Sequence, residues 1–234
     1  MMACLLLALA GPAQSWGASS RFEVRDTGTE PSKSGVVGLL ASALGRPRSA
    51  PIGDLASLRM GVRVDAEGTI QCDYQTASGA IRSDGTKNDA AVTSRRYFLA
   101  DAAFLVVLQG SPTLIEELDT ALRAPRWPLF LGRKAFPPAG PVGRGVQEGA
   151  LEDVLARGPW TDPSRRRIDD LRRRLEKGDT VTVRTVVDAE PSGGTDVRDD
   201  VPVSFEPRRF TRRTVAAGLA TLTLDVLAVP GRTA

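Results

Sequence analysis

Two apolar segments dominate the first quarter of the chain. Residues 3–9 (ACLLLAL) are apolar throughout, which predicts a strand buried on both faces. Residues 35–44 (GVVGLLASAL) predict an apolar helix. Ser32 or Ser34 can cap its first turn through a side-chain oxygen, and Gly45 can end it in the left-handed conformation.

The start of this helix is also a candidate anion site. The free N–H groups of the first turn and the positive end of the helix dipole attract an anion, and Lys33 adds a full charge. For this segment alone, an ordinary capped helix with a solvated lysine is the commoner case, so its surroundings must decide.

Alternating segments follow and predict a hairpin. Residues 59–65 alternate with period two, and residues 69–76 return as the partner strand after a turn at Glu67-Gly68. Residues 77–94 are small, polar and aperiodic, which predicts a mobile loop or a protruding hairpin tip with its apex at residues 83–87.

The next elements complete a first domain. Residues 95–108 predict one long strand, with its apolar second half in the middle of a sheet. Ser111-Pro112 begins a helix with one apolar face, and residues 127–131 predict another strand. The order strand, helix, strand pair, strand, helix, strand is that of an α+β, ferredoxin-like or RRM-like domain over residues 1–132.

A small β-rich region is expected after a Gly- and Pro-rich connection at residues 132–149. Its predicted elements are a short helix at 150–156, a highly charged helix at 165–177, a strand at 180–187, an acidic mobile loop at 190–200, and strands at 203–205 and within 214–227. This region covers residues 150–234. The charged helix is at least as well explained by a solvated face with internal ion pairs as by RNA binding.

Composition narrows the chemistry. The chain has 31 Lys and Arg against 28 Asp and Glu, a net charge of +3, which fits an anionic partner without requiring one. It contains no histidine, so mechanisms that need imidazole as a base or metal ligand are excluded within this chain. Two isolated cysteines, Cys4 and Cys72, indicate a reducing, cytoplasmic setting.

The N-terminal apolar run also resembles part of a secretory signal peptide. No Lys or Arg precedes it, and it is too short to cross a bilayer, so a buried strand is the preferred interpretation and no membrane contact is expected. An exported binding domain remains an alternative that rests on this run alone.

The sequence does not predict a catalytic, metal or cofactor site. Residues 31–34 (PSKS) lack the glycine spacing of a phosphate-binding loop, and the carboxylates are scattered beside Arg or Lys. A metal-independent endoribonuclease remains an alternative, because RNA carries its own 2′-OH nucleophile; Tyr74, Tyr97 and Lys87 would then be the candidates.

RNA binding is better supported. Arg25 and Lys33 lie near Trp16 in sequence, although a lone Trp more often plugs a core than stacks on a base. An inserted segment ends in residues 95–97 (RRY), and Arg133-Lys134 follows the last predicted strand of the first domain. Guanidinium and ammonium groups can hold phosphates while planar groups stack on bases, as single-stranded RNA requires.

Several short motifs resemble one family. They are residues 9–17 (LAGPAQSWG), 20–22 (SRF), 29–38 with its PSKSG core, 73–77 (DYQTA), 97–104 (YFLADAAF), 128–134 (PLFLGRK) and 201–210 (VPVSFEPRRF). Together they resemble the CRISPR-associated CasD family, the Cas-five subunit of the type I-E Cascade surveillance complex, over nearly the whole chain.

The resemblance implies a RAMP protein that caps the 5′ handle of the CRISPR RNA (crRNA) and docks on the backbone and large subunits of a hetero-oligomeric complex. It implies a thumb hairpin at about residues 77–95 that wedges against the RNA, and a structural rather than catalytic role. The chain departs from its relatives at Gln75, where they commonly carry histidine; glutamine cannot act as a general base, which favours the non-catalytic interpretation.

The expected RNA contacts combine both lines of reasoning. Residues 11–17 and 25–34 would hold phosphates and bases, Arg96 would clamp the strand at the thumb base by analogy with a family arginine, and Arg133 and Lys134 would add charge. The full set of expected contacts is Gln14, Trp16, Gly17, Arg25, Thr27, Ser32, Lys33, Ser34, Arg96, Tyr97, Arg133 and Lys134.

Overall fold

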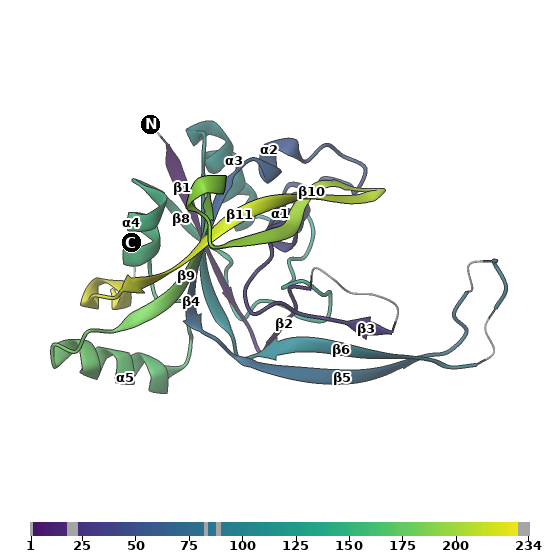
Figure 1. Cartoon of the computed structure of the whole chain (residues 1–234), viewed down its shortest axis with the longest axis horizontal. Coiled ribbons are helices and arrows are strands. Elements are labelled where there is room, and N and C mark those ends of the chain that lie inside the picture. The colour runs from purple at the N-terminus through teal and green to yellow at the C-terminus, as the bar shows by residue number, and fades with distance from the viewer. Residues whose placement is uncertain (1, 18–22, 82–83, 88–89, 229–234) are drawn as a thin grey trace.

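A computed structural model describes residues 2–17, 23–81, 84–87 and 90–228. Its centre is a seven-stranded sheet in which every neighbouring pair of strands is antiparallel (Figure 1). In spatial order the strands are β10 (Asp196–Phe205), β11 (Arg208–Thr221), β9 (Thr182–Ala189), β4 (Arg59–Ala66), β7 (Ala103–Gly110), β1 (Ala3–Ala10) and β8 (Gly143–Glu148).

The ferredoxin-like order is confirmed. Helix α1 (Lys33–Leu44) follows β1, and helix α3 (Pro112–Arg123) follows β7, so the chain runs β1-α1-β4-β7-α3-β8 with an insertion between β4 and β7. Ser32 caps α1 by accepting a hydrogen bond from the Gly35 N–H, and Gly45 ends the helix at φ 72°, as predicted.

Both faces of the central strands are covered, which explains why β1 is apolar at every position. Leu5, Leu7 and Leu9 belong to the core shared with α1 and α3. Cys4 and Leu6 point the other way and pack with the short helix α4 (Leu151–Arg157).

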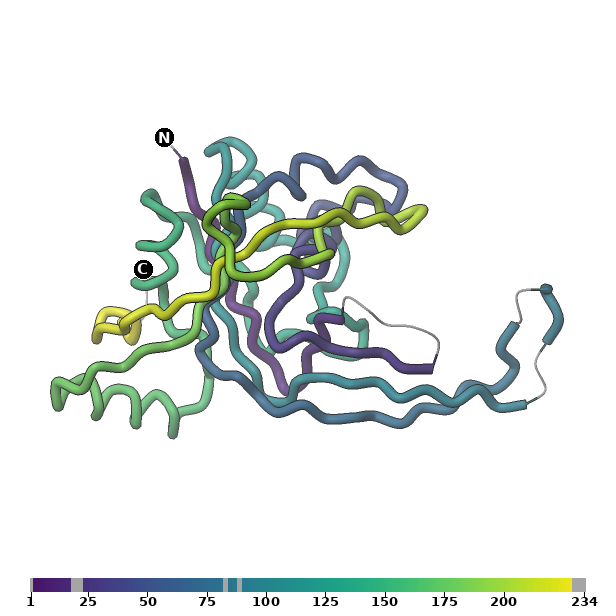
Figure 2. Tube along the Cα trace, viewed as in Figure 1, coloured from purple at the N-terminus to yellow at the C-terminus, as the bar shows by residue number. Residues whose placement is uncertain are grey.

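The insertion consists of β5 (Thr69–Ala77) and β6 (Val92–Ala100), which form a long hairpin (Figures 1 and 2). A second sheet forms where β6 also pairs with β2 (Ala13–Gln14) and β3 (Val24–Arg25), two short strands between β1 and α1 in the chain. The β5–β6 hairpin projects from the body, and near its tip a bridge joins Ile81 to Lys87. The predicted protrusion is therefore present, although residues 82–83 and 88–89 of the predicted tip lie outside the described part, as does the family motif at residues 20–22.

Two strand predictions around this hairpin are wrong for one shared reason. The segment 69–76 pairs with β6 instead of with 59–65, and the predicted long strand 95–108 divides into β6 and β7 in different sheets. Gly68 at φ 72° and Asp101 at φ 55° turn the chain out of the main sheet and back into it. A Cβ at Gly68 would lie 2.6 Å from the carbonyl oxygen of Ala100, so the two turns sit against each other.

The prediction of a strand at 127–131 is also wrong. Pro128 offers no N–H to a strand ladder, and the loop instead donates from Arg126 and Trp127 to the last turns of α1. The fourth strand of the ferredoxin order is β8, within the segment 132–149 expected to be a connection. The expected loop 190–200 holds a 3-10 turn (Pro191–Gly193) and the first half of β10.

The C-terminal region continues the main sheet, because β9 pairs with β4. Helix α5 (Arg165–Glu176) and a 3-10 turn (Leu224–Leu227) enclose a small cluster of Leu171, Val181, Leu222 and Val226 beside it. The short α2 (Gly53–Ala56) precedes β4. The division into residues 1–132 and 150–234 remains a prediction, with one sheet running through both. No helix in the described residues is long and apolar enough to cross a membrane.

Candidate nucleic-acid interface

A groove of about 1340 Å³ runs along α1, and we call it the α1 groove. Its lining residues come from residues 15–17, the β3 region, α1, β6, the segment 127–137 and the β10–β11 turn. Seven lining side chains are cationic, Arg25, Arg46, Arg48, Arg96, Arg133, Lys134 and Arg208, and two are acidic, Asp26 and Asp199. This excess of positive charge in a concave surface favours an anionic ligand.

Most of the predicted site residues lie together at this groove. Those that line it are Trp16, Gly17, Arg25, Ser32, Ser34, Arg96, Arg133 and Lys134. Gln14, Thr27, Lys33 and Tyr97 are not among the lining residues. Segments that are more than a hundred residues apart in sequence thus meet at one surface, which the resemblance led us to expect.

Arg133 holds the second sheet and the groove wall together. Its Nη2 donates to the carbonyl oxygen of Tyr97 at 2.8 Å and to that of Arg25 at 3.4 Å. Its guanidinium lies 5.6 Å from the centre of the Phe136 ring, which in turn packs against Phe98. Burial, and then the nearby charge of Arg96, lower the pKa of Arg133. A bound phosphate would relieve this repulsion between like charges.

Arg96 has no carboxylate partner among the described residues and donates from Nε to Ser94 at 3.0 Å. Side chains alternate along β6, so Arg96 shares a face with Phe98, whereas Tyr97 points to the opposite face. Gln75 lies opposite Ser94 on β5, on the same face as Arg96. Tyr97 therefore supports the groove through its carbonyl group, which accepts from the lining residue Arg133, and not through its ring.

Trp16 and Gln14 are core residues, which corrects the expectation that their side chains hold bases. Trp16 is 2% exposed, and its indole N–H donates to the Gln14 side chain at 3.1 Å. Gln14 in turn donates to the carbonyl groups of Leu9 and Ala102. A Cβ at Gly35 would lie 2.8 Å from the Trp16 ring, so the ring plugs the core under the first turn of α1.

Lys33 also binds other residues of the protein, through both its side chain and its backbone. Its Nζ lies 2.7 Å from the carboxylate of Asp188, and its backbone N–H donates to the carboxylate of Asp200 at 2.7 Å. Arg213 bridges both carboxylates. The predicted anion seat at the start of α1 exists, but Asp200 fills it, so the assignment of Lys33 to an RNA phosphate is corrected.

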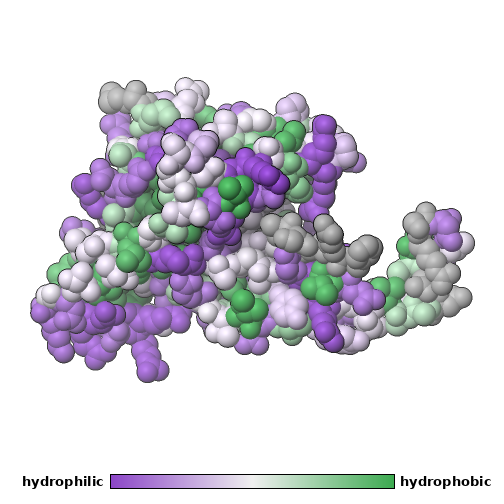
Figure 3. Space-filling view, viewed as in Figure 1, coloured by the Kyte–Doolittle hydropathy of each residue, from purple (hydrophilic) through white to green (hydrophobic). Residues whose placement is uncertain are grey.

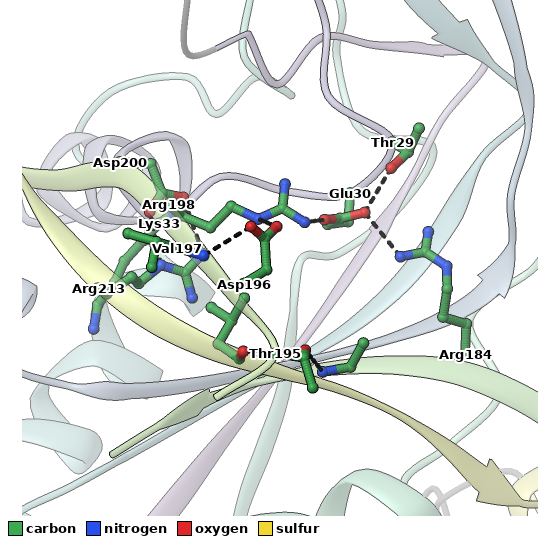
Figure 4. A network of polar contacts seen from close by, with 12 residues as sticks. Thr29, Glu30, Lys33, Arg184, Thr195, Asp196, Val197, Arg198, Asp200 and Arg213 are labelled. Atoms are coloured by element: carbon green, nitrogen blue, oxygen red, sulfur yellow. Dashed lines mark hydrogen bonds and ion pairs between the residues drawn. The ribbon is translucent and has the colours of Figure 1, made fainter. Parts of the chain in front are cut away.

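The loop before α1 is fixed by a second set of ion pairs. Glu30 accepts from Thr29 and pairs with Arg184 of β9 and Arg198 of β10, each at 2.9 Å (Figure 4). Burial by itself raises the pKa of Glu30, but the hydrogen bonds from Thr29 and Arg184 hold it below its usual range. The β9–β11 strands thus set the position of the groove wall.

Two small contacts shape the adjoining loops. Thr27 accepts a hydrogen bond from the backbone N–H of Trp16 at 3.0 Å. A Cβ at Gly17 would lie 2.5 Å from the Asp26 carbonyl oxygen, so the loops containing these residues are in close contact. The roles of Thr27 and Gly17 are therefore to shape the wall.

Sequence reasoning missed one half of the groove. At the end away from Arg133 the lining includes exposed aromatic side chains, of which Trp127 and Phe210 are each 42% exposed. Arg46, which is paired with Asp54, and Arg48, which donates to the carbonyl oxygen of Phe205, line the same groove as these rings. Phe210 lies in the motif 201–210 and Trp127 directly precedes the motif 128–134, but nothing in the sequence indicates that the two segments meet at one groove.

Comparisons with known proteins identify the family of this chain. A family model for CRISPR-associated protein (Cas_Cas5) matches residues 4–218. CRISPR system Cascade subunit CasD of Escherichia coli (strain K12) is 35% identical over 158 residues, which cover 61% of this chain and 70% of that protein.

Two solved structures are similar over nearly the whole chain. One, titled "Crystal structure of Cas protein", is 37% identical with a TM-score of 0.72 and covers 97% of this chain and 100% of the other. A chain of a "CRISPR RNA-guided surveillance complex" is 34% identical with a TM-score of 0.78 and covers 98% of this chain and 95% of the other. The expected RAMP-like α+β fold is confirmed. Since the family model spans most of the chain, this protein belongs to the Cas5 family of CRISPR-associated proteins.

Proposed function

We propose that this chain is a crRNA-binding subunit of a Cascade surveillance complex in the cytoplasm, and that the α1 groove holds the 5′ handle of the crRNA. The observation that carries the proposal is the meeting of seven cationic side chains and exposed aromatic rings in one groove. The similarity to CasD and to a chain of an RNA-guided complex supports it.

The groove suits a single strand better than a duplex. Single-stranded nucleic acid is held by cations that follow the backbone and by planar side chains on which bases stack. The Arg96–Arg133 end offers charge with few exposed rings, whereas the Trp127–Phe210 end offers rings with arginines beside them. The first end would hold backbone phosphates and the second would receive splayed bases.

The hairpin supplies a surface for neighbouring subunits. Ile70 and Tyr74 lie on the face of β5–β6 opposite Arg96 and are 54% and 63% exposed. Exposed apolar side chains on a projecting element are typical of protein contacts. This face would dock on the backbone and large subunits while the other face wedges against the RNA.

A structural role fits the arrangement better than an endoribonuclease. The candidates Tyr74 and Tyr97 lie on the face of the hairpin away from Arg96. Lys87 lies beyond the end of the β5–β6 ladder at Ala77 and Val92. These three side chains do not converge on one reacting atom, and Gln75 cannot serve as a base.

The binding test uses the full-length chain and a labelled handle RNA in a fluorescence anisotropy titration. The variant Arg96→Gln/Arg133→Gln should bind at least about tenfold more weakly. The slope of its log affinity against log salt concentration should be smaller in magnitude by about 0.7 for each phosphate that the variant no longer neutralises. The control Arg123→Gln/Arg144→Gln removes two exposed arginines outside the groove and should bind as the unmodified chain does. Equal affinity of both variants would refute the assignment.

Catalysis is tested separately by incubating the chain with repeat RNA in EDTA. We expect intact RNA. Site-specific cleavage that disappears in Tyr74→Phe or Tyr97→Phe would establish the endoribonuclease instead.

A further inference from the structure

The charge of this protein is concentrated in a helix that the groove does not use. Residues 165–177 carry seven cations and three carboxylates, a net charge of +4, whereas the whole chain carries +3. Figures 1 and 2 place α5 and the β5–β6 hairpin at opposite ends of the long axis. In Figure 3 hydrophilic atoms gather over α5. This charge therefore lies on a part of the molecule separate from the hairpin.

The helix is anchored firmly enough to present these charges in a fixed arrangement. Leu171 is buried against Val181, Leu222 and Val226, with Leu175 packed at the edge of the same cluster. The Ser164 side chain accepts a hydrogen bond from the Arg167 N–H at the first turn. One face of α5 is thus attached to the body and the other faces solvent.

Internal ion pairs account for only part of the charge. Arg167 pairs with Asp162, Arg172 with Asp169 and Arg173 with Asp170. The remaining cations, Arg165, Arg166, Arg174 and Lys177, are exposed and pair with no carboxylate in the described part of the chain. A helix built only for solubility gains from balanced opposite charges, but this one keeps an excess of one sign.

Helical geometry places three cations along the solvent face. Arg166, Arg173 and Lys177 are separated by seven and four residues, so they form one stripe on the side opposite Leu171. The stripe is about 16 Å long at 1.5 Å per residue. Arginine also matches phosphate oxygens in a bidentate manner.

We propose that α5 is a second nucleic-acid surface, which binds the phosphate backbone of a duplex independently of sequence. Residues 165–177 contain no aromatic side chain on which an unpaired base could stack, in contrast to the α1 groove. Charge without stacking groups matches duplex binding through counterion release. The proposal does not depend on handle binding in the groove.

The test titrates full-length protein with a fluorescein-labelled duplex of arbitrary sequence over a range of salt concentrations. The variant Arg166→Gln/Arg174→Gln/Lys177→Gln retains helix propensity and leaves no carboxylate unpaired. We expect its duplex affinity to fall roughly tenfold or more. The slope of log affinity against log salt concentration should become smaller in magnitude by about 2–3, since each phosphate that these side chains neutralise contributes about 0.9.

A charge-matched control removes three exposed arginines elsewhere, Arg123→Gln/Arg144→Gln/Arg157→Gln, and should retain duplex binding. Parallel titrations with DNA and RNA duplexes identify which duplex α5 binds more tightly. The groove variant Arg96→Gln/Arg133→Gln should retain duplex binding, so failure of handle binding and failure of this proposal are distinguishable. No measurable duplex binding, or equal losses in the α5 variant and its control, would overturn the proposal. In either case an acidic protein would become the better candidate for the partner of α5.

Discussion

The carboxylate of Asp200 accepts a hydrogen bond of 2.7 Å from the backbone N–H of Lys33, at the first turn of α1. This is the position at which an isolated helix would bind a phosphate. The protein supplies its own anion there from β10, and Arg213 holds that anion in place. The start of α1 therefore anchors the C-terminal strands, and in the proposed binding mode the RNA phosphates contact other cations of the groove.

Lys33→Met should affect stability more than RNA binding. The substitution removes one partner of a largely buried ion pair, while Asp188 keeps Arg213. We expect the free energy of unfolding to fall by about 1–3 kcal/mol in urea denaturation. The affinity of the folded fraction for handle RNA should not change. Lys134→Met, at an exposed groove residue, is the control and should lower RNA affinity without lowering stability. If Lys33→Met instead lost RNA affinity and kept its stability, Lys33 would again be assigned to an RNA phosphate.

Removing an exposed ring from the groove should weaken single-strand binding. Trp127→Ala or Phe210→Ala should each cost about 1–3 kcal/mol if its ring stacks on one base, which corresponds to roughly 5- to 150-fold in the dissociation constant. Leu219→Ala, on β11 and 72% exposed, is the matched control. Anisotropy with handle RNA measures the effect, and affinities equal to that of the control would show that the rings do not contact bases.

Acid should loosen the groove wall through Glu30. Because its pKa is lowered in the folded protein, its contribution to stability is present above its pKa in the unfolded chain and is lost as the pH falls through the folded value. The free energy of unfolding should therefore decline below about pH 4–5. Glu30→Gln should be less stable at neutral pH and show a weaker decline. If the free energy of unfolding of Glu30→Gln and of the unmodified chain declined equally with falling pH, this role of Glu30 would be contradicted.

Gly35→Ala should destabilise the protein although alanine favours helices. The added Cβ would lie 2.8–2.9 Å from the Trp16 ring, so the ring or the helix must move. We expect a cost of about 1–3 kcal/mol. Gly53→Ala is the control, because a Cβ there meets nothing within 4 Å. Equal melting temperatures of the two variants would show that the contact between Gly35 and Trp16 is loose.

Local signals in the sequence predicted the fold well where one segment determines its own structure. The uniform apolarity of 3–9 and the cap residues Ser32 and Gly45 identify β1 and α1 with little ambiguity. The pairing of strands was harder to predict, because the alternation in 69–76 indicates a strand but does not indicate which strand it pairs with. The turns at Gly68 and Asp101, which send this strand to a second sheet, act together only in three dimensions.

The candidate site was predictable in charge but not in detail. Arg25, Arg96, Arg133 and Lys134 could be identified as cations near the predicted hairpin and loops, Arg133 and Lys134 within a family motif, and all four line the groove. Lys33 could not be separated from them, since Asp188 and Asp200, more than 150 residues away, neutralise its surroundings. Trp127 and Phe210 became candidates only when the chain placed them on one groove.

The place of β1 in the sheet has a consequence for biosynthesis. In the finished protein Ala3 is paired with Gly110 on one side and with Glu148 on the other. Strand β1 therefore leaves the ribosome long before either neighbour, and it waits for β8 until well over half of these residues have been made. During that interval a segment whose eight residues are all buried in the native state lacks at least one partner and is prone to aggregate. Translation that ends before β8 would release a fragment whose most apolar strand still lacks one of its partners.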